Sequence, residues 1–357
     1  MGMAKNPGKK EKNQRKRPEP LQRVRSLLRH NKRIRAAVIV TAAALLALAG
    51  WMIYQAREQD SFSLTSEGSV NMGSGYRNIT WQGKSYHYNN RVTAILFAGL
   101  DSDEEIRAYK TYASAPQADS IALMILDERK GALSVLSLSR DTMTPIHRYT
   151  LNGRDRGLFT DHLGYAYTYG DGGAASCRNL CEAVSSLLCG IPVNLYVTIN
   201  RSSLSGIAQV LGPISMTVPN DSLADLGIHA GDMLTVDENN IETFLRSRDT
   251  AQDFSNVPRM ERQRAYTSSA MARIQSLLGE KPTDVWDMME GMNKSVLTNI
   301  KRNRYLELAR IIRGLRYSDS AYLTLEGRNV TTETYDEFYP DPEALTQRVI
   351  DLFYLPD

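Results

Sequence analysis

Three apolar runs between residues 92 and 138 constrain the fold more than any other feature of the chain. They are VTAILFA at 92–98, SIALMIL at 120–126 and ALSVLSL at 132–138, and none carries a charge. Runs of this length with few polar interruptions are typical of strands that are buried on both faces of a sheet. Only a short turn at 128–131 separates the second run from the third. These two runs are therefore predicted to form an antiparallel hairpin.

Extended and helical patterns alternate through the rest of the chain. Residues 77–88 alternate around Gln82-Gly83, which predicts another hairpin, and 142–173 shows no regular pattern. Because strands interleave with helices and hairpins occur beside crossovers, we predict an α/β sandwich with a central mixed β-sheet. Further strands are predicted at 194–199, 214–218 and 322–325, and helices at 174–188, 202–211, 236–245, 258–278, 283–292, 303–313 and 342–354.

The N-terminal region is separated from this domain by its charge. Residues 1–35 carry thirteen Lys and Arg and two Glu, a net +11, whereas the remainder has 43 − 13 = 30 basic and 40 − 2 = 38 acidic residues, a net −8. A disordered charged leader or a nucleic-acid-binding tail would both have this composition. The next segment favours the leader, so no nucleic-acid partner is expected.

Residues 36–54 are nineteen residues without a charge, with Trp51 and Tyr54 at the far end. At 1.5 Å per residue this run nearly spans a hydrocarbon core of about 30 Å. The alternative, a cleaved signal peptide, has a shorter apolar run and a shorter leader. By the positive-inside rule we predict a single-pass protein of the cell membrane. Its predicted parts are a cytoplasmic tail at 1–35, a transmembrane helix at 36–54, a linker at 55–75 and an extracellular domain at 76–357.

The three cysteines, Cys177, Cys181 and Cys189, lie in one predicted helix and just beyond it. A disulfide is permitted outside the membrane. No histidine lies close by in the sequence to complete a zinc ligand set. We expect small buried side chains with one disulfide or none.

Charged residues stand where the buried strands end. Asp101 follows the first run, Asp119 precedes the second, and Arg140 and Asp141 follow the third. If the three strands pair antiparallel in sequence order, these side chains converge at one edge of the sheet. Two close carboxylates repel each other unless a proton or a cation lies between them. Mg²⁺, or Mn²⁺ as the alternative, is therefore the expected metal on Asp101 and Asp119.

A second group of charges lies at 244–264, which holds five arginines and no lysine. The guanidinium fork matches phosphate with two parallel hydrogen bonds. Arg246 and Arg248 share a face only in extended chain, whereas Arg259, Arg262 and Gln263 form one stripe of a helix. Together they could close around an anion. The alternative is a salt-bridged surface formed with nearby acidic residues. No Walker A, GxGxxG, GxSxG or HExxH motif is present.

The order of six short motifs resembles the LytR-CpsA-Psr family of cell-envelope phosphotransferases. These are AGLDS (98–102), ADSIALMIL (118–126), SLSRD (137–141), AYTYGDGG (166–173), LRSRD (245–249) and RMERQ (259–263). The resemblance covers roughly residues 90–354, and a membrane anchor followed by a linker is also usual in the family. It implies an α/β/α sandwich with an apolar pocket for a polyprenyl chain. It also implies transfer of a glycopolymer, a teichoic acid or polysaccharide, from a polyprenyl-pyrophosphate carrier to a peptidoglycan hydroxyl.

The resemblance assigns roles to matching positions. Asp101 and Asp119 match the carboxylates that hold Mg²⁺ and pyrophosphate, and Asp101 or Asp141 would orient or deprotonate the acceptor hydroxyl. The matching phosphate-binding set is Arg140, Arg246, Arg248, Arg259 and Gln263, to which the helical stripe adds Arg262.

Four departures from the family pattern concern the acceptor side and the polymer more than the pyrophosphate site. The spacer from Asp253 to Arg259 is longer than usual. The arginine that often follows the first aspartate is missing. Ser139 stands where the family has proline, and Gly164 where it often has asparagine. Two alternatives therefore stay open, a polyprenyl-pyrophosphate pyrophosphatase and a membrane-anchored protein without catalytic activity.

The charge bias around 36–54 predicts that the domain lies outside the membrane. Protease added to intact spheroplasts should remove the chain beyond about residue 60 and spare the basic tail, as detected by mass spectrometry. Protection of the domain would contradict the extracellular location, and a peptidoglycan acceptor with it.

Overall fold

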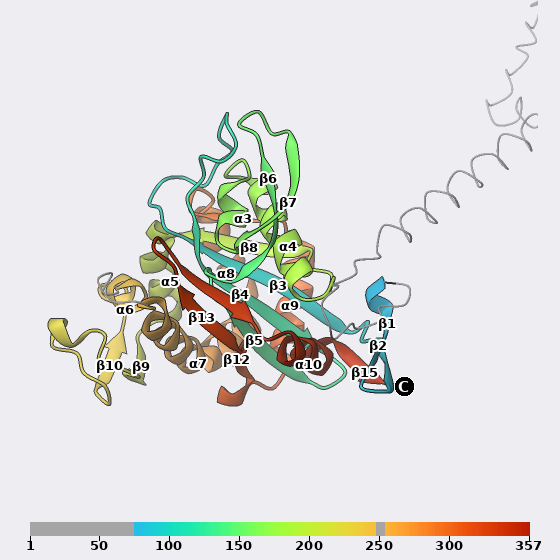
Figure 1. Ribbon diagram of the computed structural model, residues 1–357. Helices are drawn as coiled ribbons and strands as arrows, with labels where there is room; N and C mark the ends of the chain where they lie inside the picture. Colours follow the sequence, from blue (N-terminus) through green and yellow to red (C-terminus); the bar gives the residue numbers. More distant parts are fainter. Residues whose placement is uncertain (1–74, 248–253) are drawn as a thin grey trace, which may run out of the picture. The chain divides into compact units, whose positions relative to one another are not determined.

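The computed structural model describes residues 75–247 and 254–357 of the chain (Figure 1). The predicted tail and transmembrane helix lie outside these residues, as does the predicted linker apart from residue 75. Arg248 lies outside them too. Within the two described ranges, no helix is both long and apolar enough to cross a membrane.

A six-stranded mixed sheet forms the centre of the domain (Figure 1). In spatial order its strands are β11 (Val296–Thr298), β8 (Leu195–Asn200), β3 (Val92–Leu100), β4 (Ala118–Asp127), β5 (Ala132–Leu138) and β12 (Tyr322–Thr324). β4 pairs antiparallel with both β3 and β5, whereas β8 joins β3 and β12 joins β5 in parallel. The three apolar runs therefore occupy the middle of the sheet, and the predicted hairpin between the second and third is confirmed.

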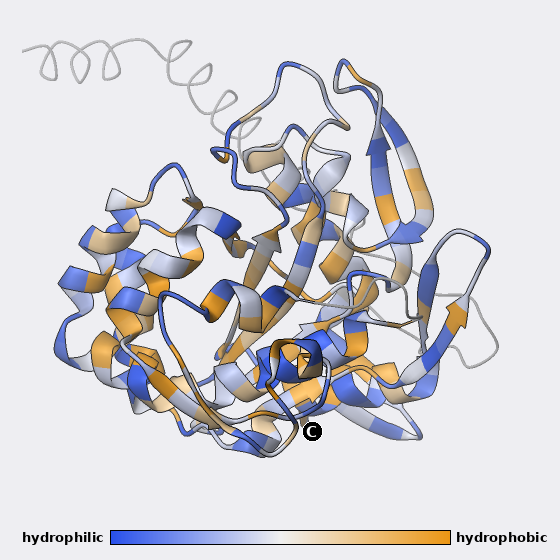
Figure 2. Cartoon of the chain, turned by 90° about the vertical axis from the view of Figure 1, so that its left-hand side faces the viewer, coloured by the Kyte–Doolittle hydropathy of each residue, from blue (hydrophilic) through white to orange (hydrophobic). Residues whose placement is uncertain are grey.

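Two helical layers cover the sheet, and side chains alternate between them along each central strand. On β3, Leu96 and Ala98 join one core, whereas Ile95 and Phe97 join the other. This is why the runs are apolar throughout instead of alternating. In Figure 2 hydrophobic residues gather on the central strands and on the helix sides turned toward them. The first core includes α3 (Tyr165–Thr168), α4 (Ala174–Leu187) and α10 (Pro342–Phe353), and the second includes α7 (Asn256–Glu280), α8 (Pro282–Gly291) and α9 (Arg302–Gly314). The predicted central mixed sheet with helices on both faces is confirmed.

A third apolar cluster lies beside α7 and positions one end of it. It is built from α5 (Leu204–Leu211), α6 (Ile241–Arg246) and the antiparallel strands β9 (Ile214–Thr217) and β10 (Met233–Val236). The helix predicted at 236–245 begins later than expected, because Val236 ends β10. The chain then enters α7, which was predicted at 258–278 and has Pro258 in its first turn.

Of three further antiparallel pairs outside the central sheet, one was predicted and two were not. The hairpin at 77–88 is confirmed as β1 (Asn78–Trp81) and β2 (Lys84–Tyr88), which β15 (Tyr354–Pro356) joins. The stretch 142–173, expected to be irregular, contains the antiparallel pair β6 (Met143–Tyr149) and β7 (Asp155–His162). A similar pair is β13 (Gly327–Thr331) and β14 (Asp336–Pro340). β7 and β13 are largely exposed and β6 and β14 mostly half-buried, so these strands lack the apolar pattern that marks a buried strand.

The three cysteines are buried and free. Cys177 and Cys181 belong to α4 and Cys189 follows it, and all three pack in the first core. Cys177 contacts Thr198, with 3.3 Å between sulfur and hydroxyl oxygen. Burial raises the pKa of the Cys177 thiol to about 11 and that of Cys181 to about 12. Buried thiols with a raised pKa are poor nucleophiles.

This arrangement predicts that the native protein is inert to iodoacetamide at neutral pH. After denaturation without a reductant, all three thiols should be alkylated, which mass spectrometry would detect as three added groups. A single added group would mean that two of the cysteines form a disulfide, contrary to the structure.

Candidate functional site

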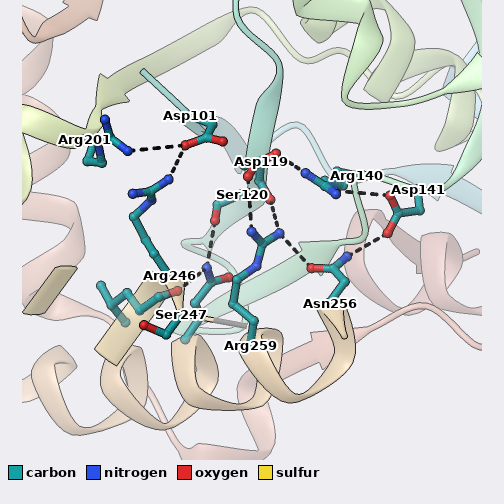
Figure 3. Close-up of polar contacts among 12 residues, drawn as sticks. Asp101, Asp119, Ser120, Arg140, Asp141, Arg201, Arg246, Ser247, Asn256 and Arg259 are labelled. Atoms are coloured by element: carbon teal, nitrogen blue, oxygen red, sulfur yellow. Dashed lines mark hydrogen bonds and ion pairs between the residues drawn. The ribbon is translucent and has the colours of Figure 1, made fainter. Parts of the chain in front are cut away.

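The pairing of β3, β4 and β5 brings the charged strand ends to one edge of the sheet. Leu100 lies opposite Ala118, and the Asp101 amide donates to the Gln117 carbonyl at 3.3 Å. The next pair, β4 with β5, sets Ile121 opposite Leu138. Asp101, Asp119 and Arg140 therefore lie at the same edge, as the strand-end argument predicts (Figure 3).

Asp119 lies between two arginines from different elements. Its Oδ1 pairs with Arg140 Nη1, and its Oδ2 lies 3.2 Å from Arg259 Nη1. Arg259 Nη2 also donates to the Asp119 carbonyl at 2.9 Å. The Asp119 side chain is only 12% exposed and that of Arg259 only 4%. The contact therefore joins β4, β5 and α7 through one largely buried carboxylate.

Arg140 is held from its other side by the turn that follows β5. Its Nε lies 3.3 Å from Asp141 Oδ1. The second oxygen of Asp141 accepts from Asn256 Nδ2 at 2.9 Å, and the Ser139 hydroxyl accepts the Asp141 amide at 3.2 Å. A hydroxyl at position 139 thus organises this turn, in place of the proline usual in the family. Both oxygens of Asp141 are engaged, so its main role here is to position Arg140.

Asp101 forms a second, more exposed group of ion pairs. Its Oδ1 pairs with Arg246 Nη2 and lies 3.9 Å from Arg201 Nη1. Glu242 lies 2.9 Å from Arg246 Nη1, one helical turn away on α6. Asp103 pairs with Arg201. The Asp101 side chain is 46% exposed, so this group borders solvent whereas the Asp119 group is nearly closed off.

A cavity of about 210 Å³ lies between the two groups of ion pairs and the α7 face of the sheet. Its floor is apolar, with side chains from β3, β8, α5 and α7. Its polar wall includes Asp119, Ser120, Arg201, Arg246, Arg259 and Gln263. An apolar cleft with a few convergent polar groups is the usual form of a small-ligand site.

The predicted helical stripe divides between the cavity and the core. Gln263 reaches the cavity, where its Nε2 donates to the Ser120 hydroxyl at 2.8 Å. Arg262 is not among the residues that line the cavity in the described part of the chain. It is fully buried, and its Nε donates to the Phe244 carbonyl at 2.7 Å. Its Nη atoms contact Ser222 and the Ser247 carbonyl. Arg262 therefore ties the end of α6 to α7, a structural task instead of the predicted contact with phosphate.

The surroundings of Asp119 favour its charged form, whereas those of Arg262 disfavour its charged form. Burial is the largest influence on Asp119 and disfavours its charge, but Arg140 and Arg259 together outweigh it and lower its pKa. Asp119 is therefore ionised at every physiological pH. Burial, followed by repulsion from Arg259, lowers the pKa of Arg262 to about 10. Arg262 still carries a proton near pH 7.

Asp101 and Asp119 are the carboxylates that could hold a hard divalent cation at this site. Among residues 75–247 and 254–357 no group of three or more His, Cys, Asp or Glu side chains is arranged for a metal. Mg²⁺ does not need such a group, because it is usually held by one or two carboxylates with water and substrate phosphate. Both carboxylates contact arginines here, so a cation would replace guanidinium groups and release them toward a phosphate.

Arg201 and Asn256 are site residues that the sequence argument missed. Arg201 follows β8, an apolar strand parallel to β3, so the strand-end argument would have found it had it been applied to that strand. Its guanidinium lies beside Asp101, the aspartate after which the family often has an arginine that this chain lacks. Asn256 opens α7 and links Asp141 to Arg259 through contacts of 2.9 and 2.8 Å. Asn256 carries no charge, so the sequence argument, which followed charged residues, did not single it out.

Gly164 departs from the family pattern for a steric reason. Its amide donates to the Arg140 carbonyl at 2.9 Å, and its carbonyl accepts from the Ala118 amide at 3.3 Å. A Cβ at this position would lie 2.8 Å from the Ala118 carbonyl oxygen and from the Gln117 side chain. The close approach of the backbone beside Arg140 therefore requires glycine here.

The sequence of the chain is similar to one protein family and to individual proteins within it. The model of the LytR_cpsA_psr family matches residues 59–349. The polyisoprenyl-teichoic acid–peptidoglycan teichoic acid transferase TagV of Bacillus subtilis (strain 168) is 24% identical over 324 residues, which cover 88% of this chain and 75% of TagV. A transferase of the same description from Halalkalibacterium halodurans, TagU, is 25% identical over 248 residues, which cover 68% of this chain and 72% of that protein.

Solved structures share the fold. The crystal structure of B. subtilis TagV aligns with a TM-score of 0.55 at 21% identity, covering 73% of this chain and 96% of that one. A structure described as TagT bound to LIIa-WTA aligns with a TM-score of 0.54 at 18% identity, covering 74% of this chain and 90% of that one.

The Asp119 contact predicts a specific acid dependence of stability. A carboxylate with a lowered pKa in the folded state contributes stability that is present above its unfolded value of 3.8 and is lost as the pH falls through the folded value. Asp119→Asn should therefore lose about 2–3 kcal/mol at pH 7, since breaking a buried pair costs about 3–5 kcal/mol and the amide keeps some hydrogen bonding. Urea unfolding from pH 7 to pH 2 should show this deficit shrinking below about pH 4. An exposed control, Asp225→Asn, should follow wild type, and a deficit independent of pH would contradict the assignment.

Proposed function

Because the chain belongs to the LytR-CpsA-Psr family, we propose that it is a phosphotransferase that moves a glycopolymer from a polyprenyl-pyrophosphate carrier to peptidoglycan. The polymer is a teichoic acid or a related polysaccharide, in keeping with the printed descriptions of TagV and TagU. The observation that carries the proposal is the arginine wall on an apolar cavity, because a lipid pyrophosphate needs both at once. The carrier's chain would lie on the apolar floor, and its phosphates would face Arg246, Arg259 and Gln263.

The reaction is a displacement at phosphorus. The peptidoglycan hydroxyl, the C6 hydroxyl of a muramic sugar, attacks the phosphorus that bears the polymer. A new P–O bond forms, the bond to the bridging oxygen of the pyrophosphate breaks, and polyprenyl phosphate leaves. Most catalysis of phosphoryl transfer comes from stabilising charge on the transferred group. Arg140, Arg246 and Arg259 would supply that charge as planar forks held in place by carboxylates.

A carboxylate would receive or orient the proton of the attacking hydroxyl. Asp101 and Asp141 are the two candidates, and their surroundings distinguish them. Asp141 is 15% exposed and both of its oxygens hold neighbours. The more exposed Asp101 can meet an incoming hydroxyl, so we assign it to the acceptor and Asp141 to Arg140. Mg²⁺ on Asp101 and Asp119 would neutralise charge on the pyrophosphate.

The location follows from the chemistry. Both substrates occur at the outer face of the cell membrane, and the segment 36–54 is suited to anchor the chain there as a single-pass protein. A pyrophosphatase would use the same residues with water as the nucleophile. The two activities differ in whether the polymer ends on peptidoglycan or as a free phosphate.

Substitution by lysine tests whether Arg140 and Arg259 bind phosphate through the guanidinium fork or only contribute a positive charge. Arg140 contacts Asp119 and Asp141 through different nitrogens, a geometry that one ammonium cannot reproduce. Arg140→Lys and Arg259→Lys should fold and yet lose about 10²–10³ in kcat, as other preorganised donors do. Turnover is measured by transfer of a radiolabelled lipid-linked teichoic acid precursor to peptidoglycan.

Arg264→Lys is the matched control on the same helix. Arg264 is exposed and does not line the cavity, so its variant should keep wild-type turnover. Equal losses in all three variants would refute the assignment. Release of free polymer phosphate, with no label on peptidoglycan, would favour the pyrophosphatase.

A further inference from the structure

Exposed apolar side chains concentrate on one side of the site. Seven large apolar side chains are exposed among the described residues. Three of them belong to the β6–β7 hairpin, and the fourth lies in the turn between β13 and β14. Their exposed fractions are Leu151 63%, Leu158 48%, Phe159 40% and Tyr335 51%. Such clustering marks a binding surface more often than chance exposure.

Two of these side chains, Phe159 and Tyr335, are connected through neighbouring rings to Tyr165 and Tyr169. We call Phe159, Tyr165, Tyr169 and Tyr335 the aromatic platform. The ring centroid of Tyr165 lies 6.5 Å from that of Tyr335 and 6.2 Å from that of Tyr169. The guanidinium of Arg148 then links Tyr169 to Phe159, with centroid distances of 5.3 and 5.0 Å. The platform thus runs from the β13–β14 turn across α3 to the hairpin.

Polar groups accompany the rings. Asp161 accepts the Tyr169 hydroxyl at 3.1 Å, pairs with Arg148 and lies 3.1 Å from the His162 ring. Hydroxyls and a carboxylate therefore lie at the edges of the rings, and a guanidinium lies over two of their faces. A membrane-binding surface would show apolar residues flanked by lysines. This mixture of ring faces and hydrogen-bonding groups suits a ligand with apolar faces and hydroxyl edges, which describes a saccharide.

The platform borders the site at Arg140, on the side away from the cavity. Tyr165 follows Gly164, whose amide donates to the Arg140 carbonyl at 2.9 Å. On the other flank, the Asp141 carbonyl accepts from the Phe338 amide at 2.8 Å, three residues beyond Tyr335. In Figure 1, β6, β7 and α3 stand together beyond the ends of the central strands. A donor in the cavity and a chain on the platform would therefore meet at Arg140.

We propose that the aromatic platform binds the acceptor, a glycan strand of peptidoglycan. This inference depends on the proposed transferase function and assigns its second substrate to a surface. Sugar rings of the strand stack on Tyr335, Tyr165, Tyr169 and Phe159. Asp161 and Arg148 bind the hydroxyl and carboxylate groups along its edges. The strand is thereby directed so that one muramic hydroxyl faces the phosphorus beside Arg140.

The test uses the full chain in detergent, with Phe159→Ala, Tyr335→Ala and the double variant. Both side chains are exposed, so truncation should not disturb the core. Met233→Ala and Leu226→Ala are the controls, because these residues are exposed at 72% and 57% on the β9–β10 side. Calorimetry measures binding of soluble, uncrosslinked peptidoglycan glycan strands without donor. The transfer assay separately gives KM for the strands and for the lipid-linked donor.

We expect each platform variant to weaken strand binding and raise the acceptor KM roughly threefold to tenfold, since an aromatic contact is worth that much. The donor KM should stay at the wild-type value, and both control variants should match wild type throughout. Unchanged strand binding and acceptor KM in the double variant would overturn the proposal. Weakened binding to vesicles of anionic phospholipid instead of strands would also overturn it, in favour of a membrane surface.

The calorimetric result also separates this inference from the function it depends on. Wild-type protein that binds strands through the platform but transfers no polymer would uphold the surface and refute the transferase. If every platform variant transfers polymer as well as the wild type does, the transferase is upheld and the surface is refuted.

Discussion

The carboxylate of Asp119 is the contact on which the rest of the site depends. It neutralises Arg140 and Arg259, which arrive from β5 and α7 and are themselves largely buried. Two guanidinium groups this close and this far from water repel each other unless an anion lies between them. The strand register that delivers Asp119 to the edge therefore also determines where both arginines can be held. Three elements that are distant in the sequence are fixed to one another by a single side chain.

This arrangement explains how one site can be both stable when empty and attractive to a phosphate. Each cavity arginine described here already contacts a carboxylate, so no guanidinium is buried without compensation. Each phosphate group of a pyrophosphate likewise offers a guanidinium two acceptor oxygens, and it carries more negative charge. Exchange of a carboxylate for a phosphate oxygen, aided by a divalent cation on the released carboxylates, costs little reorganisation. Preorganisation of this kind is what electrostatic catalysis requires.

The sequence predicts the sheet and one edge of the site because both depend on short-range patterns. Apolar runs mark the central strands, and charges at their ends converge once the strands pair antiparallel. Arg201 was missed because the strand-end argument covered only the three apolar runs, and β8 pairs with β3 across about 100 residues of sequence. The predicted stripe of Arg262 and Gln263 divides because about 100° separates adjacent positions around a helix. That rotation sends Gln263 toward the cavity and Arg262 toward the end of α6. The β6–β7 hairpin escaped because exposed strands need no apolar pattern.

The most direct test of this account is a crystal structure of the domain with a short-chain polyprenyl pyrophosphate and Mg²⁺. The account predicts the diphosphate against Arg140, Arg246 and Arg259, the metal on Asp101 and Asp119, and the isoprenoid chain on the apolar floor of the cavity. In that complex the arginines should have exchanged carboxylate oxygens for phosphate oxygens. A diphosphate bound elsewhere, with the contacts of Asp119 to Arg140 and Arg259 unchanged, would contradict it.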